Sequence, residues 1–290
     1  RQLVAHCSKE VPGYRQALRE AGLTAARELT PATWAGLPIL ERATLQERGQ
    51  SLRAVNAPEG HRKTASVSTS GSPGTPVSVL STEVSRLMWQ AFTMRDHYWH
   101  DTDLSGKLAA IRIFGDKQQA SYPTGLVAAD WGAPASLLHA TGPSASLDIH
   151  TDLRDQMEWL QRQQPNRLIT FPTNAAELAR LSLAKDIDLS CIDSVRLLSE
   201  VTDAATRKLV SDAWGASVTE GYSAQEVGHI ALQCPDHDHL HIQAENLFVE
   251  IVDQAGRPCG PGETGRVLVT TLHNYAMPLL RYALGDYATV

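Results

Sequence analysis

The chain has 290 residues, of which 42% are apolar and 20% are charged, and 26 Lys and Arg against 32 Asp and Glu give a net charge of −6. This composition is typical of a globular protein and excludes disordered and collagen-like chains, and no stretch approaches the roughly 18 consecutive apolar residues of a membrane span. The basic residues are scattered among the acids, so binding to nucleic acid is not favoured.

The length predicts about two domains. Because the sequence starts at Arg1 and ends at Val290 within a segment expected to be ordered, both ends are interpreted as cut. No secretory leader is found, and the four cysteines are too few for a disulfide scaffold. These features favour a reducing compartment, so a cytoplasmic location is expected.

The first 60 residues predict a helical segment broken by Pro and Gly. Its predicted helices cover 14–21, 31–35 and 40–48. A longer helix is predicted over 83–100, because Leu87, Ala91 and Met94 recur on one side. The apolar run 108–114 predicts a buried strand, and a loop-rich stretch follows from 115 to 146.

Strands and helices alternate in the middle of the chain. A helix capped by Thr151 is predicted first, and after it a strand over 167–171, a helix over 175–184 and a strand over 195–199. This alternation predicts an α/β fold with a mostly parallel sheet flanked by helices. The last 45 residues alternate apolar and polar side chains on both sides of turns, which predicts a β-rich end. The expected segments are a helical 1–60, an α/β core over 61–240 and a β-rich subdomain over 241–290.

The segment from Ser68 to Pro76 consists almost entirely of Ser, Thr, Gly and Pro. Small residues and hydroxyls let backbone amides converge on phosphate oxygens, as an anion-binding nest requires. A Walker-type loop does not match, because no Gly-Lys-Ser/Thr follows. Taken alone, such a segment is more often a solvated loop.

Four segments that follow one another along the chain favour nucleotide binding over a solvated loop. Thr-Ser-Gly-Ser-Pro-Gly-Thr-Pro (69–76), Leu-Ser-Glu (198–200), Glu-Gly-Tyr-Ser-Ala-Gln-Glu-Val-Gly (220–228) and Pro-Leu-Leu-Arg-Tyr-Ala-Leu-Gly-Asp (278–286) resemble the motifs of the adenylate-forming (ANL, acyl-CoA synthetase) superfamily. The last motif, and the opening over 11–40, resemble its phenylacetate-CoA ligase branch. The resemblance covers nearly the whole chain and implies the layered fold of an N-terminal adenylation domain.

Members of this family join ATP and a carboxylate into an acyl-adenylate and release pyrophosphate, and most then transfer the acyl group to a thiol. The resemblance implies ATP and AMP as nucleotides, CoA as co-substrate and an aryl or apolar acid, with Trp131, Ala133, Pro172 and Asn174 as candidate pocket walls. Binding to nucleic acid or to a membrane is not expected, and the protein could form an oligomer.

The resemblance also implies roles for individual residues. The β- and γ-phosphates would be held by Thr69, Ser70, Gly71, Ser72, Gly74 and Thr75. Glu226 would bind Mg²⁺, which suits a hard carboxylate ligand, and Gln225 would reach the α-phosphate. Glu200, Tyr222 and Ser223 would line the nucleotide site, with Tyr222 stacked on adenine, and Asp286 would accept hydrogen bonds from the ribose hydroxyls. Arg281 fits a structural ion pair and a substrate contact equally well.

Three positions depart from the family pattern. Pro73 replaces a hydroxyl residue, Gln225 stands where Thr is usual, and Val77 stands where many members have Lys. The family's small C-terminal lid domain, which supplies a catalytic lysine, is expected to be absent from this chain. Two alternatives to a CoA ligase therefore stay open: a non-catalytic nucleotide- or ligand-binding homologue, and an adenylating enzyme that transfers to a carrier-protein thiol or an amine.

A second cluster carries metal-ligand residue types. Cys234 and His237 have zinc-knuckle spacing, His241 follows at the start of a strand, and Cys259 lies in a later turn. These four residues are predicted to hold a structural Zn²⁺, with His237 favoured over His239 by spacing. The alternative is a polar loop with two unrelated cysteines.

Overall fold

A computed structural model describes residues 1–23, 28–68, 76–114 and 120–290. In it the chain forms two compact units, each described by itself. Unit 1 comprises Arg1–Trp89, Ser223–Ile230 and Ile242–Val290, and unit 2 comprises Gln90–Tyr222 and Ala231–His241. The predicted segment boundaries at 60 and 240 stay a prediction. The predicted phosphate-binding residues Thr69, Ser70, Gly71, Ser72, Gly74 and Thr75 lie outside the described residues.

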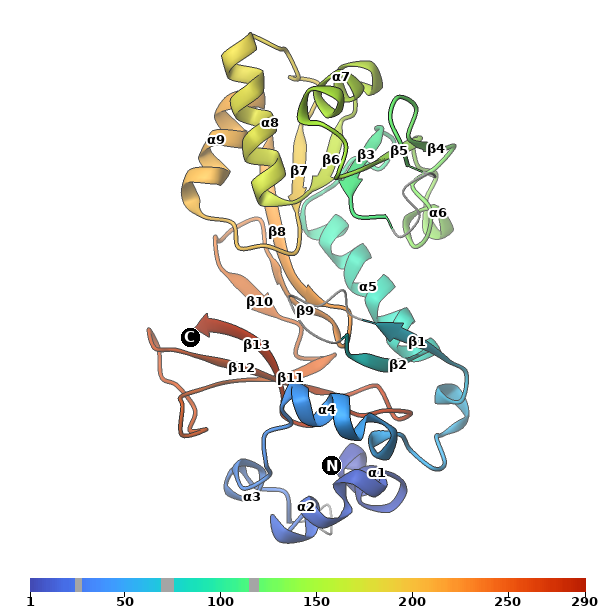
Figure 1. The fold of residues 1–290 in the computed structure, drawn as a ribbon, viewed down its shortest axis with the longest axis vertical. Coiled ribbons are helices and arrows are strands. Elements are labelled where there is room, and N and C mark those ends of the chain that lie inside the picture. Colours follow the sequence, from blue (N-terminus) through green and yellow to red (C-terminus); the bar gives the residue numbers. More distant parts are fainter. Residues whose placement is uncertain (24–27, 69–75, 115–119) are drawn as a thin grey trace. The chain divides into compact units, whose positions relative to one another are not determined.

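Unit 2 is built around a mostly parallel sheet (Figure 1). The strand order is β10-β9-β8-β7-β6-β3-β5-β4, and β8, β7, β6, β3 and β5 are parallel while β4 is antiparallel to β5. The strands are β3 (Leu108–Arg112), β4 (Leu126–Ala128), β5 (Ser144–Asp148), β6 (Arg167–Thr170), β7 (Ser194–Leu197), β8 (Ser217–Ala224), β9 (Gly228–Gln233) and β10 (Leu240–Ile242). The chain crosses into unit 1 within β8, β9 and β10. The predicted α/β class is confirmed.

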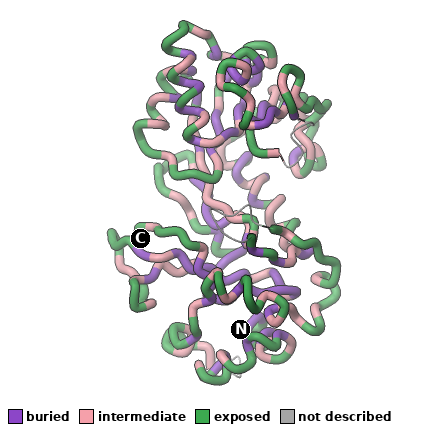
Figure 2. The backbone as a smooth tube through the Cα atoms, viewed as in Figure 1, coloured by how far each residue is buried: buried purple, intermediate pink, exposed green. Residues whose placement is uncertain are grey.

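The helices of unit 2 lie before or between its strands, and the last three of them connect parallel strands. They are α5 (Glu83–Trp99), which begins in unit 1, α6 (Ala135–Leu138), α7 (Leu153–Gln163), α8 (Pro172–Lys185) and α9 (Ala204–Trp214). The apolar faces of α7, α8 and α9 pack on the sheet around Trp159, Leu160 and Leu168, which are fully buried. Figure 2 shows the strands buried and the outer helix faces exposed.

The ends of these helices follow local chemistry. Helix α7 has Asp152 at its N-cap, so the predicted cap Thr151 is wrong by one residue, and neither side chain makes the capping bond there. Helix α8 begins with Pro172, whose missing N–H has no role in the first turn. Gly215 ends α9 at a φ of 71°, a left-handed conformation that suits glycine.

Unit 1 combines N-terminal helices with two antiparallel sheets. Its helices are α1 (Gln2–Glu10), α2 (Arg15–Glu20), α3 (Pro31–Ala35) and α4 (Arg42–Arg48), and its sheets are the hairpin β1 (Thr64–Ser68) with β2 (Ser78–Thr82) and the order β11 (Leu247–Val252), β12 (Thr264–Thr271), β13 (Tyr282–Thr289). Helix α1 was not predicted, although Leu3, Val4 and Cys7 give it a buried stripe. The predicted β-rich end is confirmed.

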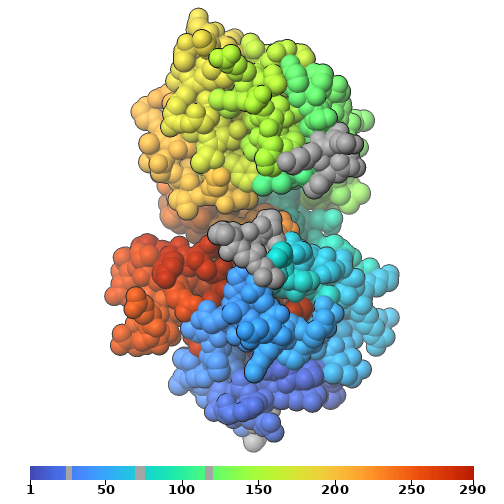
Figure 3. Space-filling view, in the orientation of Figure 1, coloured from blue at the N-terminus to red at the C-terminus, as the bar shows by residue number. Residues whose placement is uncertain are grey.

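The N-terminal segment of the chain contacts the C-terminal sheet in unit 1 (Figure 3). Leu40 forms a parallel bridge with Tyr282, and the Leu40 N–H donates to the Arg281 carbonyl at 3.0 Å. The segment between α3 and α4 therefore pairs with the start of β13. Among the described residues, no helix is long and apolar enough to span a membrane.

Candidate functional site

The motif 220–228 occupies the second half of β8 and the turn into β9. Gly228 starts β9 with a φ of 92°, which L side chains rarely adopt. A Cβ added at Gly228 would also lie 3.6 Å from the Trp89 ring. That distance is an ordinary van der Waals contact, so it is the backbone conformation of the turn that requires glycine, and Gln225 and Glu226 lie at the tip of this turn.

Glu226 is held by two partners that the sequence did not single out. Its carboxylate Oε1 lies 3.7 Å from the Arg42 guanidinium and accepts a 3.4 Å hydrogen bond from the Tyr282 hydroxyl, and its side chain is only 8% exposed. Burial, followed by the nearby Glu226 charge, raises the pKa of Tyr282 to about 12. The phenol therefore stays a neutral donor, and the carboxylate is fixed in place.

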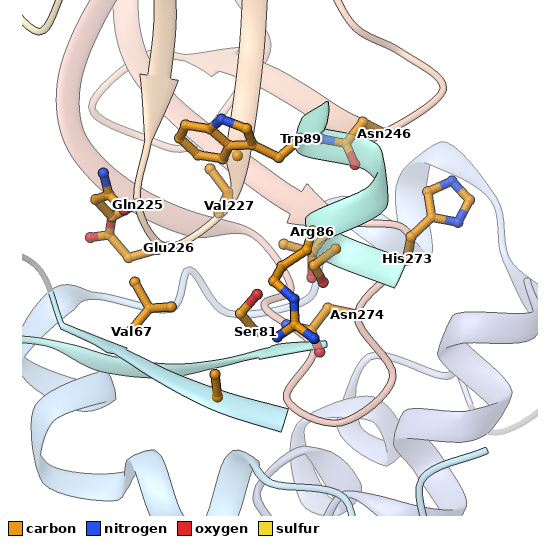
Figure 4. A pocket seen from close by; sticks show the side chains of 14 residues that line it. Val67, Ser81, Arg86, Trp89, Gln225, Glu226, Val227, Asn246, His273 and Asn274 are labelled. Carbon is orange, nitrogen blue, oxygen red and sulfur yellow. The ribbon is translucent and has the colours of Figure 1, made fainter. Parts of the chain in front are cut away.

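Glu226 lines a cavity of about 230 Å³ within unit 1 (Figure 4). Its walls come from β1 and β2, the start of α5, the β8–β9 turn, and the segments around Asn246 and 271–274. The lining residues are Ala65, Val67, Ser81, Ser85, Arg86, Trp89, Gln225, Glu226, Val227, Gly228, Asn246, Thr271, His273 and Asn274. Glu226 is the one carboxylate and Arg86 the one strong cation among these described lining residues. A polar ligand with a negatively charged group fits such a lining.

A second cavity, of about 460 Å³, lies within unit 2. Ile113 follows the carboxyl end of β3 and Phe171 that of β6, and both line it. Strands β3 and β6 are neighbours in the sheet. After β3 the chain runs through β4 to β5, which pairs with the edge of β3 away from β6. After β6 it runs to β7, which pairs with the edge of β6 away from β3, so a topological switch point lies between β3 and β6. Ligands of open parallel sheets bind at such points.

The polar side chains of this second cavity are held by hydrogen bonds. Glu200 accepts from the backbone N–H and the hydroxyl of Thr173 at 3.0 and 3.1 Å, which places its carboxylate at the N-terminus of α8. The helix dipole favours a negative charge there. The Asn174 amide donates to Gln156 Oε1 at 2.9 Å, and Gln156 is 2% exposed. The predicted residues Glu200 and Asn174 therefore line one cavity.

The remaining predicted nucleotide residues are distributed over both units. Tyr222 lies half-buried in the unit 2 part of β8, and Ser223 follows it in the unit 1 part. Asp286 lies exposed on β13. Their predicted contacts with a nucleotide stay predictions. Trp131 is absent from the lining of the unit 2 cavity, and its indole N–H donates to the Gly106 carbonyl at 2.9 Å.

Arg281 is part of a buried network in unit 1. Its guanidinium donates to Glu250 at 3.2 Å and to the carbonyls of Ala35 and Leu37 at 2.8 and 2.6 Å. The residue is 2% exposed and adopts a φ of 48°. Of the two roles open from the sequence, these contacts favour the structural ion pair, which joins β13 to β11 and to the end of α3.

Three of the four predicted zinc ligands come together in unit 2. The ligand atoms of Cys234, His237 and His241 all lie within 4.8 Å of one another. Cys259 is not in this group and belongs to unit 1, where its backbone N–H donates to Ile251 and its Sγ lies 2.6 Å from a Cβ built on Gly265. Partial burial, followed by the charges of Glu263 and Asp253, raises the pKa of the Cys259 thiol. That shift disfavours the thiolate that zinc binds.

Several residues of the unit 1 site were not predicted from the sequence. The lining residues Arg86, Trp89 and Asn246, and Arg42, which pairs with Glu226, lie outside the recognised motifs, and their side chains are common on helices and in turns. Only their convergence on the β8–β9 turn distinguishes them. Thr173 could have been found, because it follows Pro172 at the start of a predicted helix behind a strand.

The chain was compared with known proteins. No family model matches it. It is 27% identical to a phenylacetate-coenzyme A ligase of Thermus thermophilus over 99% of its own length and 63% of that protein's length. The chain therefore spans less than two thirds of this curated relative.

Solved structures resemble the whole chain. A 2-hydroxyisobutyryl-CoA ligase, crystallised with its acyl-adenylate and CoA, matches with a TM-score of 0.76 and 16% identity, covering 99% of this chain and 67% of that one. An anthranilate CoA ligase matches with a TM-score of 0.58 and 18% identity, covering 79% of this chain and 46% of that one. The fold is thus the one that these CoA ligases share, and the predicted resemblance to the phenylacetate-CoA ligase branch is confirmed as a similarity in sequence and in fold.

Proposed function

We propose that this chain is the large, substrate-binding part of an ATP-dependent acid–thiol ligase. In the first step a carboxylate oxygen attacks the α-phosphorus of ATP, the bond to the bridging oxygen breaks, and pyrophosphate leaves. In the second step the CoA thiol, after losing its proton, attacks the acyl carbon, and AMP leaves with the former carboxylate oxygen. The observation that carries the proposal is the similarity to a phenylacetate-CoA ligase along 99% of the chain.

The lining of the unit 1 cavity supports the first step of this proposal. Attack of one anion on another is slowed by charge repulsion, so catalysis depends on neutralising the phosphates and holding the reactants in line. We assign Glu226 to the binding of Mg²⁺, because it is the carboxylate among the described lining residues of the unit 1 cavity. Mg²⁺ commonly uses one or two carboxylates together with substrate phosphates, so one protein carboxylate fits. When bound, the cation neutralises phosphate charge.

The chain's own residues then orient the substrates. Arg42 and Tyr282 hold the Glu226 carboxylate, and the Gln225 amide next to it is proposed to donate to the α-phosphate. Tyr222 and Ser223 on β8, Glu200 after β7, and the segment 69–75 are proposed to contact the nucleotide, with Asp286 binding the ribose hydroxyls.

The acid is proposed to be aryl or apolar, with its apolar part in the unit 2 cavity. Ile113, Ile149 and Phe171 supply the apolar wall there, while Asn174 offers a polar contact. Such a lining binds an apolar body and fixes one polar end. CoA as the acceptor is taken from the CoA ligases that the chain resembles.

ATP–pyrophosphate exchange tests the proposal. The purified chain is incubated with ATP, labelled pyrophosphate, Mg²⁺ and a panel of aryl and alkyl acids, and exchange that depends on one class of acid is expected. Thioester formation with CoA is then followed by mass spectrometry. If ATP binds but no acid supports exchange, the chain is a non-catalytic nucleotide-binding homologue. Exchange without CoA thioester would instead point to a carrier-protein thiol or an amine as acceptor.

A further inference from the structure

We infer that Cys234, His237 and His241 form a zinc site with three protein ligands, which fastens the β9–β10 connection of unit 2. The inference does not rest on the proposed ligase activity. It also differs from the four-ligand site expected from the sequence, because Cys259 belongs to the other unit.

The distances within the group fit a zinc ion. Cys234 Sγ lies 3.4 Å from His237 Nδ1 and 3.1 Å from His241 Nε2. Tetrahedral zinc with Zn–S near 2.3 Å and Zn–N near 2.05 Å places such S and N ligands roughly 3.5 Å apart. Both sulfur–nitrogen distances lie within about half an ångström of that value, and all three ligand atoms lie within 4.8 Å of one another. A water molecule can take the fourth position, as it does in zinc sites with three protein ligands.

The type of donor atom selects the metal. One thiolate and two imidazoles are soft to borderline ligands that suit zinc and discriminate against Mg²⁺ and Ca²⁺, which prefer oxygen. The histidine rings are also ordered by their neighbours, since the His241 ring packs edge-on against Trp99 with centroids 6.0 Å apart. A fixed ring lowers the entropic cost of binding the ion.

The position of the site gives it a structural role. Cys234 directly follows β9, His237 lies in the connecting loop and His241 lies on β10, so one ion would join both strands to their loop. The ligand residues are absent from the lining of both cavities described above. An ion at this place closes a short loop and stabilises the folded state by binding it preferentially.

A chain of hydrogen bonds leads from this loop to the motif on β8. Gln233 Nε2 donates to the His237 carbonyl at 3.5 Å, and Gln233 Oε1 accepts from the Glu220 N–H at 3.2 Å and from Arg207 at 3.3 Å. Arg207 in turn pairs with the Glu220 carboxylate at 3.1 Å. The zinc loop therefore supports the first residue of the segment 220–228.

Metal analysis and cobalt substitution test the inference. The chain is purified without chelator or metal-affinity resin, and about one zinc ion per chain is expected by elemental analysis. After chelator treatment, Co²⁺ is titrated in, and a thiolate-to-cobalt charge-transfer band in the near ultraviolet is expected. Added Zn²⁺ should abolish this band and raise the midpoint of thermal unfolding.

Variants locate the ligands. Cys234→Ser is expected to lose the charge-transfer band and the thermal shift on adding Zn²⁺, whereas Cys259→Ser should keep both. If Cys234→Ser does not fold, as judged by circular dichroism, His241→Gln is used and should lose the thermal shift and weaken Co²⁺ binding. A wild-type chain without zinc and without the band would overturn the inference. Loss of the band in Cys259→Ser would also overturn it, in favour of the site expected from the sequence.

Discussion

The two cavities are built from the sequence in different ways. The cavity of unit 2 is lined by residues 113–200, which follow consecutive strands of one parallel sheet, so its place follows from topology. The cavity of unit 1 is lined by segments between residues 65 and 274 that belong to a hairpin, a helix start, a turn and two loops. The first site can be located once the strand order is known, whereas the second exists only because distant segments pack together.

The largest expected effect tests that packing in unit 1. Arg281→Met leaves the largely buried Glu250 carboxylate without its cationic partner and removes the bonds to the carbonyls of Ala35 and Leu37. Breaking a buried ion pair costs about 3 kcal/mol or more, so the free energy of unfolding in urea should fall by that amount.

A surface ion pair provides the control for Arg281. Arg257 pairs with Asp253 but its side chain is 78% exposed, so Arg257→Met should change the free energy of unfolding by no more than about 0.5 kcal/mol. Equal losses in the two variants would contradict the structural role and would favour a substrate contact for Arg281.

The next effect tests the chemistry of the unit 1 cavity. Glu226→Gln keeps the shape of the side chain but removes the charge proposed to bind Mg²⁺. The rate of ATP–pyrophosphate exchange is expected to fall roughly 100-fold in the folded variant. The exposed Glu59→Gln, in the same unit, serves as the control and should exchange like the wild type. Exchange by Glu226→Gln within about twofold of the wild type would refute the assignment.

A smaller effect tests the unit 2 cavity. Phe171→Ala removes a large part of the apolar wall after β6. The KM for a bulky aryl acid should rise about tenfold relative to that for a short aliphatic acid, because an aromatic contact contributes about 1.5 kcal/mol, while the KM for ATP stays the same. Phe248→Ala, at an exposed position in unit 1, is the control. An equal rise for both acids would place the acid elsewhere.

The smallest expected effect concerns His97, a buried histidine on helix α5. Burial, together with Arg167, Arg196 and His100, lowers the pKa of His97 to about 4. Between about pH 6.5 and pH 4 the unfolded chain therefore binds a proton at His97 that the folded chain does not, so stability falls as the pH falls.

Urea unfolding at two pH values measures this contribution. Between pH 7.5 and 5.5 the wild type should lose about 1 kcal/mol more stability than His97→Gln, which cannot take up the proton. The exposed His139→Gln should behave like the wild type. The same pH dependence in His97→Gln and in the wild type would show that His97 does not contribute.

The periodic parts of the fold could be predicted from the sequence. Helix α3 (Pro31–Ala35) and strand β11 (Leu247–Val252) fall where the pattern placed them, because a proline start and strict alternation are local signals. Helix α1 and the short strand β4 were not predicted. Strand β4 has three exposed residues and no apolar alternation, and it forms only by pairing with β5.

The candidate site could be predicted in part for the same reason. Gln225 and Glu226 were found because they stand in a recognisable motif, and the zinc group was found from its Cys-x-x-His spacing. Arg42 and Tyr282 were not linked to Glu226, because they lie 184 positions before it and 56 after it and carry no local signal for the contact. Cys259 was placed in the zinc group on the assumption that a hairpin would return it to Cys234.

By itself the sequence determined the α/β class, the order of the motifs and the residue types for phosphate, carboxylate and metal chemistry. These depend on periodicity and on chemistry within a few residues. Only the tertiary structure showed that Arg281 joins a buried ion-pair network, that Arg42 and Tyr282 contact Glu226, and that three of the four predicted zinc ligands lie together. Such contacts join residues far apart along the chain, and their formation depends on the burial and hydrogen bonding of the whole unit.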